Sequence, residues 1–349
     1  GLCSSEQNMI GHFTDDTKVL EFINSNDLKR LAPMGTSCPD HFLRTKIKPL
    51  ILALDPEDDL MDASAVLEKI TPSFEQYRKD YQEYYDSCKR SDSPAIRDAN
   101  PVVILYPGVG MFTFAKNKQT ARVASEFYIN AVNVMRGAEA ISKYTSLPRQ
   151  EAFDIEYWLL EEAKLQRQPK EKPLSRKVAL ITGSGGGIGR AIADKLIYEG
   201  ATVVFTDISE DYLKEATAQY SPDQAIACQC DVTSAESIEA AVQKASLQFG
   251  GLDIVVHSAG LAISKPVEDT TETDWDLLQD VLVKGQFLLS RAAAKIMRKQ
   301  NLEGNIINIV SKNGLVSGPN NAGYGTAKAA QMHMSRLLAA ELAPDQIRV

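Results

Sequence analysis

Five short apolar segments, each followed by a helical pattern, most constrain the fold of the second half of this 349-residue chain. They are rich in β-branched residues and cover 177–183, 201–207, 225–232, 252–260 and 304–311. Apolar runs of this length are typical of strands buried on both faces of a parallel sheet, with helices as crossover connections. We therefore predict an α/β domain with a Rossmann-type, doubly wound parallel sheet.

The segments between these strands carry local helix signals. Gly200 directly follows the helical pattern of residues 190–199, and glycine commonly ends a helix in this way. Thr233 and Glu236 have the spacing of a capping box before residues 237–245. Both signals agree with crossover helices between the strands.

The first strand runs directly into a glycine-rich loop, TGSGGGIG at residues 182–189. Gly183, Gly187 and Gly189 permit a tight turn and let backbone N–H groups and a helix N-terminus approach a pyrophosphate. The helix that follows has an apolar face formed by Ile188, Ile192 and Leu196. A glycine loop between a buried strand and an amphipathic helix predicts a dinucleotide-binding site.

The second strand ends at Asp207, 18 residues beyond Gly189. A carboxylate at this place can accept hydrogen bonds from the adenosine ribose hydroxyls. It would also repel a 2′-phosphate, and neither Gly186 nor Ile208 supplies a compensating positive charge. The sequence therefore predicts NAD rather than NADP.

Tyr324 and Lys328 lie one helical turn apart, so their polar ends point into the same space. Taken alone, such a pair is more often an accident on a surface helix. Its place after the dinucleotide loop and the strands makes it a candidate catalytic pair.

These ordered motifs resemble those of the short-chain dehydrogenases/reductases over roughly residues 175–349. The resemblance rests on TGSGGGIG, Asp207, CDV, HSAG, Ser311 and YGTAK, with Ser311 13 residues before Tyr324. It implies that Ser311, Tyr324 and Lys328 are catalytic. It also implies a set of cofactor contacts: Gly183, Ser184, Gly187, Ile188, Gly189, Asp207, Asp231, Val232, Ala259, Gly260, Tyr324 and Lys328.

The chemistry of the pair explains the residue types. Tyrosine, with an ordinary pKa of about 10, is a poor base at neutral pH unless a positive charge stabilises its phenolate. By resemblance, Lys328 supplies that charge and also bonds to the nicotinamide ribose. Tyr324 then exchanges a proton with the substrate oxygen, Ser311 holds that oxygen, and hydride moves to or from NAD.

Two positions depart from the family pattern. The chain has His257 and Ser258 where most members have two asparagines, and Leu282 where an asparagine usually stands. Leucine cannot hold the water that links the lysine to solvent in such enzymes. The proton relay must run differently or more slowly, or the enzyme favours another substrate class.

Residues 100–135 read as a strand, a glycine turn, a short strand and a helix. The predicted apolar face of this helix consists of Ala124, Phe127, Ala131 and Val134. The segment resembles a turn and helix of class II sugar-phosphate aldolases, with Val109 where the metal-binding histidine would stand. Valine cannot ligate zinc, and His12 and His41 are 29 residues apart. We predict no metal site in this chain and expect zinc only in an aldolase part outside it.

Two other patterns occur in the first half. Arg44, Lys46 and Lys48 are a candidate phosphate contact, although a solvated basic face is the favoured interpretation. An apolar helix stripe, interpreted as packing, consists of Phe74, Tyr77, Tyr81, Tyr84 and Cys88.

Charge and two prolines interrupt all periodicity near residues 161–177. We expect 1–165 to be the C-terminal part of a class II aldolase-like domain and 166–176 to be a linker. Residues 177–349 would then be an NAD-binding short-chain dehydrogenase domain, incomplete at its C-terminus.

Together the halves resemble the bifunctional rhamnulose-1-phosphate aldolase/lactaldehyde dehydrogenase family. That resemblance implies cleavage of a ketose 1-phosphate to dihydroxyacetone phosphate and lactaldehyde, then NAD-dependent oxidation of the aldehyde, in rhamnose catabolism. The oxidation would act on the aldehyde hydrate, because no cysteine is placed as an acyl-forming nucleophile.

Two alternatives stay open. One is a dehydrogenase of sugar alcohols or other secondary alcohols, with the first half as a docking module. The other is a non-catalytic NAD-binding scaffold, which Leu282 and the altered HSAG motif suggest.

Composition limits the partners. A hydrophobic content of 44% and a formal net charge of −8 are ordinary for a globular protein and argue against a basic face for nucleic acid. Five cysteines without a CxxC pair fit a reducing compartment, with Cys228 and Cys230 as core residues. No run reaches the roughly 18 apolar residues of a membrane span. We expect a cytoplasmic homo-oligomer with a small-molecule substrate and no nucleic-acid or membrane partner.

Because the chain lacks an initial Met and stops in DQIRV, which looks like the opening of a strand, we expect an internal piece of a longer protein.

Overall fold

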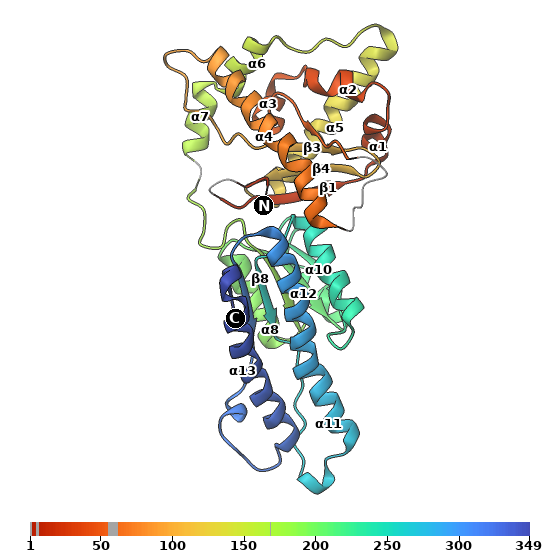
Figure 1. Cartoon of the computed structure of the whole chain (residues 1–349), viewed down its shortest axis with the longest axis vertical. Coiled ribbons are helices and arrows are strands. Elements are labelled where there is room, and N and C mark those ends of the chain that lie inside the picture. The colour runs from red at the N-terminus through yellow and green to blue at the C-terminus, as the bar shows by residue number, and fades with distance from the viewer. Residues whose placement is uncertain (1, 5–6, 55–61, 168) are drawn as a thin grey trace. The chain divides into compact units, whose positions relative to one another are not determined.

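The computed structural model describes residues 2–4, 7–54, 62–167 and 169–349 (Figure 1). The chain divides into two compact units, Gly1–Glu171 and Lys172–Val349.

The first unit contains a mixed four-stranded sheet in the order β1-β4-β3-β2. Its strands are β1 (Ile10–Thr14), β2 (Leu50–Ile51), β3 (Val103–Tyr106) and β4 (Gly110–Ala115). The β1/β4 and β3/β4 pairs are antiparallel, and β2 pairs with β3 in parallel. The predicted strand, glycine turn and second strand are therefore present as β3 and β4.

Helices pack on this sheet and on one another. They are α1 (Thr17–Ile23), α2 (Leu28–Leu31), α3 (Phe42–Thr45), α4 (Ala63–Cys88), α5 (Lys118–Ile141), α6 (Arg149–Glu156) and α7 (Leu159–Gln166), with the 3₁₀ turns η1 (Ala32–Met34) and η2 (Pro39–His41). The predicted stripe on α4 is buried at all five positions and forms one core cluster with β2, β3 and α6. Its interpretation as packing is confirmed.

The buried face of α5 differs from the predicted one. Ala124 and Ala131 are buried, but Val134 is 41% exposed. The buried face continues instead through Tyr128, Val132 and Met135, which pack into the core with β3 and β4. Ala124, Tyr128, Ala131 and Met135 are spaced by four, three and four residues, as one face of a helix requires.

The second unit contains a six-stranded sheet in the order β10-β9-β8-β5-β6-β7. The strands are β5 (Val178–Thr182), β6 (Thr202–Asp207), β7 (Ala225–Gln229), β8 (Ile254–His257), β9 (Gly304–Asn308) and β10 (Ile347–Arg348). Every adjacent pair is parallel. All five predicted strands and the doubly wound parallel sheet are confirmed, and the segment DQIRV contributes β10.

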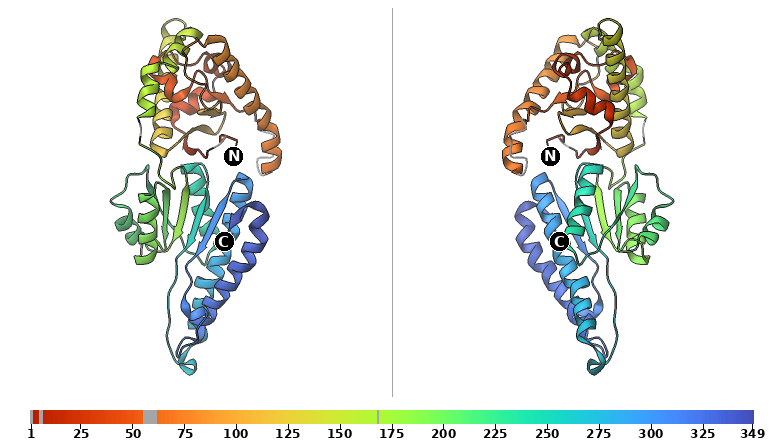
Figure 2. Two further views of the ribbon diagram at one scale, coloured as in Figure 1. Left: turned by 90° about the vertical axis from the view of Figure 1, so that its left-hand side faces the viewer. Right: turned by 90° about the vertical axis from the view of Figure 1, so that its right-hand side faces the viewer.

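The crossover helices cover both faces of this sheet. They are α8 (Gly187–Tyr198), α9 (Glu210–Thr217), α10 (Ala235–Phe249), α11 (Glu272–Leu278), the π-helical segment η4 (Gln279–Lys284), α12 (Gly285–Gln300) and α13 (Ala322–Leu342), with 3₁₀ turns η3 (Val267–Asp269), η5 (Lys312–Gly314) and η6 (Ala343–Asp345). Figure 2 shows α8 and α9, in green, on one side of the sheet and α12 and α13, in blue, on the other. This arrangement leaves the carboxyl ends of the strands open between the layers.

Two predicted helix details are wrong. The N-cap of α10 is Ser234, whose hydroxyl accepts from Ser237 N at 3.2 Å, because Thr233 is bound to Asp231 instead. On α8, Ile192 and Leu196 pack on the core as predicted, but Ile188 is 65% exposed, and the fully buried positions are Gly189, Ala193 and Ile197. The C-terminal signal of α8 is confirmed, since Gly200 has a φ of 102° just beyond the helix.

Candidate active site at the carboxyl end of the parallel sheet

A cleft of about 520 Å³ opens where β5, β6, β7 and β8 end. It is lined by the segments that directly follow these strands. Nine of the residues predicted to contact the cofactor lie there: Gly183, Gly187, Ile188, Gly189, Asp207, Asp231, Val232, Ala259 and Gly260. The exposed Ile188 is therefore a cleft residue rather than a core residue.

The glycine loop requires glycine at two positions. Gly183 has a φ of +66°, and a Cβ there would lie 2.7 Å from Ala259 Cα. A Cβ at Gly189 would lie 2.3 Å from the Gly183 carbonyl oxygen. The N-cap of α8, Gly186, has no side-chain cap, so the first amides of this helix are open to an anion in the cleft.

Ser184 does not line the cleft, although it was predicted to contact the cofactor. Its side chain is buried, donates to the Thr206 carbonyl at 3.2 Å and accepts from Thr206 N at 2.8 Å. Ser184 thus ties the glycine loop to β6.

Asp207, the last residue of β6, also lines the cleft. Its carboxylate accepts from Gly185 N at 3.1 Å and from Ser209 N at 3.0 Å. A Cβ at Gly185 would lie 3.0 Å from the Asp207 carboxylate and 2.6 Å from Tyr212 Cβ. The two charged residues of the lining are Asp207 and Asp231, both acidic.

Ser311, Tyr324 and Lys328 lie beyond the lining of this cleft. Lys328 is buried on α13, and its Nζ donates to the Ile309 carbonyl at 2.9 Å. The same Nζ lies 5.7 Å from the centroid of the Tyr324 ring. Burial lowers the pKa of Lys328 below its ordinary value.

Ser311 follows β9 and caps the turn η5, where its Oγ accepts from Asn313 N at 3.3 Å. Tyr324 packs against the apolar cluster of Leu278, Leu282 and Ala327, and so does Leu261, which also lines the cleft. The structure therefore places Tyr324 beside Lys328 and on the same apolar cluster as the cleft residue Leu261.

Leu282 is fully buried in η4 and belongs to the same apolar cluster as Tyr324. Its backbone carbonyl accepts a hydrogen bond from Gln331 Nε2 at 2.7 Å. A π-helical turn often marks a functional segment, because it exposes backbone groups that an α-helix would pair. Gln331 is a residue that the sequence reasoning missed.

Gln331 belongs to a buried polar layer between α12, α13 and β9, formed by Gln286, Asn308, Gln331 and Ser335. Gln286 Nε2 donates to the Gln331 carbonyl at 3.2 Å and to Ser335 Oγ at 3.1 Å. Asn308 Nδ2 donates to Ser335 Oγ at 3.0 Å. The signal in the sequence was two polar residues, Gln331 and Ser335, spaced one turn apart after Lys328 on the same helix.

His257 is buried at the end of β8, with its Nδ1 3.3 Å from Thr182 Oγ1. Burial, and secondarily the Lys328 charge, lowers the pKa of His257 to about 4, so the ring is neutral at pH 7. Thr182 Oγ1 also accepts from the backbone N–H of Ser258 and Ala259, each at 3.2 Å. The altered HSAG motif is thus anchored to β5 through Thr182.

Neither a metal site nor a membrane span is found in the described ranges. There, no group of three or more His, Cys, Asp or Glu side chains is arranged to hold a metal ion. No helix in the described part of the chain is both long and apolar enough to cross a membrane. Val109 lies in the turn between β3 and β4 and is 36% exposed.

Comparison with known proteins gives a family for each half. Residues 1–165 match the model of the aldolase class II second domain, and residues 177–349 match that of the short chain dehydrogenases. The uncharacterized oxidoreductase YuxG of Bacillus subtilis is 37% identical over 353 residues, which cover 100% of this chain and 51% of YuxG. The chain thus spans about half the length of that relative.

Other relatives match the second half alone. The NAD-dependent glycerol dehydrogenase of Listeria innocua is 35% identical over 180 residues, covering 52% of this chain and 70% of that protein. A crystal structure of a short chain dehydrogenase from Mycobacterium smegmatis is 33% identical with a TM-score of 0.50, covering 53% of this chain and 80% of that one. Through residues 177–349 the chain belongs to the short-chain dehydrogenase family, fused here to a segment of the aldolase class II second-domain type.

Proposed function

We propose that the second unit is an NAD-dependent dehydrogenase that acts on a small hydroxy-aldehyde or alcohol. The observation that carries the proposal is the position of Lys328. Its buried ammonium is fixed to the Ile309 carbonyl and lies 5.7 Å from the Tyr324 ring centroid. A buried cation beside a tyrosine suits proton transfer.

The cleft fits NAD. The uncapped start of α8 and the glycine loop suit a pyrophosphate, and the Asp207 carboxylate suits ribose hydroxyls. Because the lining holds two acidic and no basic side chains, a 2′-phosphate would be repelled. NAD, when bound, supplies the hydride acceptor.

The residues of this chain supply the proton chemistry. The Tyr324 hydroxyl exchanges a proton with the substrate oxygen, and the Ser311 hydroxyl donates a hydrogen bond to that oxygen. The Lys328 ammonium favours the ionised form of its tyrosine neighbour and binds the nicotinamide ribose. Asp207 orients the adenosine ribose.

Two lines of support bear on the substrate. The Listeria innocua relative carries the name of a glycerol dehydrogenase, and the whole-chain resemblance points to lactaldehyde. Both are small, hydroxylated molecules. Burial raises the pKa of the cleft residue Cys230 to about 11, so its thiol is protonated, and an aldehyde would be oxidised as its hydrate.

For the complete protein we extend the proposal to a ketose 1-phosphate aldolase coupled to this dehydrogenase, in rhamnose catabolism. That extension rests on the sequence resemblance. The second candidate, a non-catalytic NAD-binding scaffold, is favoured by Leu282, which fills the space beside Tyr324 with an apolar side chain.

Steady-state kinetics of the complete protein test the proposal. We expect turnover of lactaldehyde, glycerol or a related small alcohol with NAD, and much weaker turnover with NADP. Binding of NADH without turnover of any of these substrates would favour the scaffold.

A further inference from the structure

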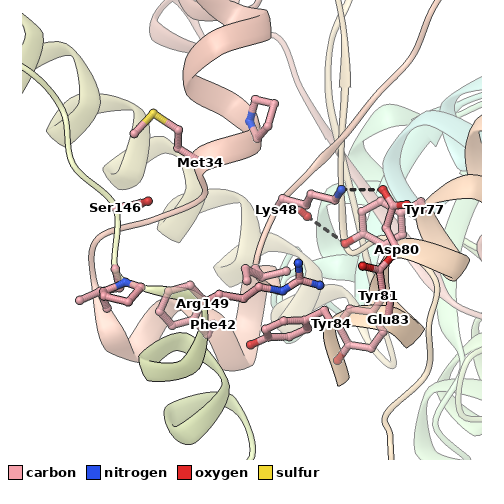
Figure 3. Close-up of a pocket in the computed structure, with 14 residues that line it drawn as sticks. Met34, Phe42, Lys48, Tyr77, Asp80, Tyr81, Glu83, Tyr84, Ser146 and Arg149 are labelled. Atoms are coloured by element: carbon pink, nitrogen blue, oxygen red, sulfur yellow. Dashed lines mark hydrogen bonds and ion pairs between the residues drawn. The ribbon is translucent and has the colours of Figure 1, made fainter. Parts of the chain in front are cut away.

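The first unit contains a pocket of about 610 Å³ (Figure 3). One wall is the face of α4 that carries Tyr77, Asp80, Tyr81 and Tyr84, and the opposite wall is the segment 146–149 that leads into α6. The β3–β4 turn with Val109, where the aldolase resemblance would place a metal ligand, contributes nothing to the lining. The pocket is therefore separate from that position, and its volume suits a small metabolite.

The aromatic wall is held rigidly. Tyr77 OH donates to the Lys48 carbonyl at 2.8 Å, and Tyr81 OH donates to Glu156 Oε1 at 2.6 Å. Behind the wall, the buried Lys46 ammonium lies 4.1 Å from the Tyr81 ring centroid and donates to the Asn100 carbonyl at 2.7 Å. A ligand that meets this wall does not have to order it first.

Beside the aromatic wall, Lys48 and Asp80 form an ion pair. Lys48 Nζ pairs with Asp80 Oδ2 at 2.7 Å, and Gln76 Nε2 donates to the other oxygen of Asp80. Although burial alone would raise it, the pKa of Asp80 is lowered by these bonds and by the nearby Arg149 charge. Asp80 is thus already neutralised by Lys48.

The lining holds two basic and two acidic side chains: Lys48 pairs with Asp80, and Arg149 and Glu83 remain. The Arg149 guanidinium carbon lies 5.5 Å from the Tyr84 ring centroid, and within the described residues it makes no ion pair. Arg149 is also the first residue of α6, and the N-cap, Pro148, provides no side-chain cap. The first amides of α6 and the guanidinium therefore offer hydrogen-bond donors and positive charge at one end of the pocket.

We propose that this pocket is a binding site for a small metabolite with one oxyanion group, a carboxylate or a phosphate. The oxyanion is held by Arg149 and the first amides of α6, with Lys48 beside it. The carbon skeleton lies on the aromatic and apolar wall formed by Phe42, Tyr81 and Tyr84. This site is independent of the dehydrogenase chemistry.

Calorimetric titration of the 349-residue chain tests the proposal with three matched probes that carry no hydroxyl or aldehyde group for the dehydrogenase to oxidise: propyl phosphate, butyrate and the neutral butyramide. NAD is present throughout, so that the glycine loop of the second unit is not the binding site measured. We expect saturable binding of at least one of the two anions and none of butyramide. The tighter anion identifies the oxyanion.

Variants locate the site. Arg149→Ala should weaken anion binding by about tenfold or more, and Arg149→Lys should weaken it less, because a point charge replaces a two-pronged donor. Arg136→Ala is the matched control, since Arg136 is also an exposed arginine of this unit, paired with Glu21 on α1 at 2.6 Å. It should bind like the wild type. Circular dichroism verifies that each variant is folded.

Three results overturn the proposal: no saturable heat at millimolar anion, butyramide binding as tightly as the anions, or an unchanged affinity in folded Arg149→Ala. Because the Arg149 variants report on the first unit alone, failure of NAD to bind would count against the proposed dehydrogenase and not against this site.

Discussion

The side-chain amide of Gln331 donates to the backbone carbonyl of Leu282 at 2.7 Å, one turn beyond Lys328 on α13. This bond joins the helix that carries the candidate catalytic pair to the π-helical turn η4. The position that differs most from the family pattern, Leu282, is therefore held through its backbone by a neighbour of the candidate catalytic lysine.

We predict that Gln331→Leu lowers both stability and turnover. It removes the Gln331 donor from the buried Leu282 carbonyl, to which His257 also bonds, and the loss of one such bond costs about 0.5–1.5 kcal/mol of unfolding free energy. A shift of α13 against η4 should reduce turnover roughly 10- to 100-fold while NAD affinity changes little. Chemical denaturation and steady-state kinetics of the complete protein measure both effects.

Gln300→Leu is the matched control. Gln300 also binds backbone groups, accepting from Leu252 N at 2.7 Å and donating to the Leu252 carbonyl at 2.8 Å. Leu252 precedes β8, at the end of the sheet opposite the cleft. This variant should lose stability and keep its turnover, and an equal loss of turnover in both variants would argue against a role of Gln331 at the site.

Tyr324→Phe should lower turnover by roughly 100- to 10,000-fold with NAD affinity little changed. The substitution removes the proton-transferring hydroxyl and keeps the ring that packs with Leu278 and Leu282. Rapid kinetics with NAD and fluorescence titration with NADH separate the two effects. Retention of more than about a tenth of wild-type turnover would falsify the proposed mechanism.

Lys328→Met should be more damaging than Tyr324→Phe, because it removes the charge beside the tyrosine and a ribose contact together. Both turnover and NADH affinity should fall. The stem of methionine fills the buried space of the lysine, so thermal unfolding should verify an intact fold. Unchanged NADH affinity in a folded Lys328→Met protein would remove Lys328 from the cofactor site.

Asp207→Ala should narrow the preference for NAD over NADP. The carboxylate is the charge nearest the expected adenosine ribose, and no basic side chain lines the cleft. Comparing kcat/KM for the two cofactors measures the change. Asp231→Asn, which alters the other acidic residue of the lining, should change the ratio of kcat/KM for NAD to that for NADP by less. Equal or better use of NADP by the wild type would contradict the cofactor assignment.

His257 should make stability depend on pH. Its pKa falls from 6.5 to about 4 on folding, so between these values the unfolded chain binds more protons than the folded one. Stability is therefore complete above pH 6.5 and decreases as the pH falls toward 4, by up to about 3 kcal/mol. Denaturant unfolding across this range should show a weaker pH dependence in His257→Asn, and identical profiles for the two proteins would exclude His257 as the cause.

The sheet and the nucleotide cleft could be predicted because both depend on local patterns. Apolar β-branched runs identify β5 to β9, and the glycine loop and Asp207 directly follow the first two of them. In a parallel sheet the carboxyl ends of neighbouring strands lie along one edge, so position in the sequence determines position in the cleft.

Contacts that depend on tertiary packing could not be predicted in this way. Lys46 was expected on a solvated basic face, yet it is 9% exposed and bound to the Asp98 and Asn100 carbonyls. Burial lowers its pKa to about 8. Its partners lie more than 50 positions away in the sequence, and a periodic pattern cannot predict contacts at that separation.

Competition between neighbouring side chains explains the other errors. Thr233 and Ser234 can both cap α10, and the Asp231 carboxylate decides between them by binding the Thr233 hydroxyl and N–H at 2.8 Å each. Ile188 has the spacing of a core residue, but the α8 positions that face the sheet are the small Gly189 and Ala193. Close helix–sheet packing selects the small residues and turns Ile188 outward.

The segment that joins the two halves matters for anyone who wishes to produce the dehydrogenase alone. Leu174 N donates to the Glu199 carbonyl at 3.0 Å, the Leu174 side chain packs on the core of the parallel sheet, and a Cβ at Gly200 would lie 2.9 Å from Ser175 Oγ. Residues 172–176 were predicted to belong to a linker, but they pack on the second unit and form its first segment. A protein that begins at Lys172 would retain this segment. A protein that begins at Lys177, where the family match begins, would lack the segment and expose the apolar surface that Leu174 covers.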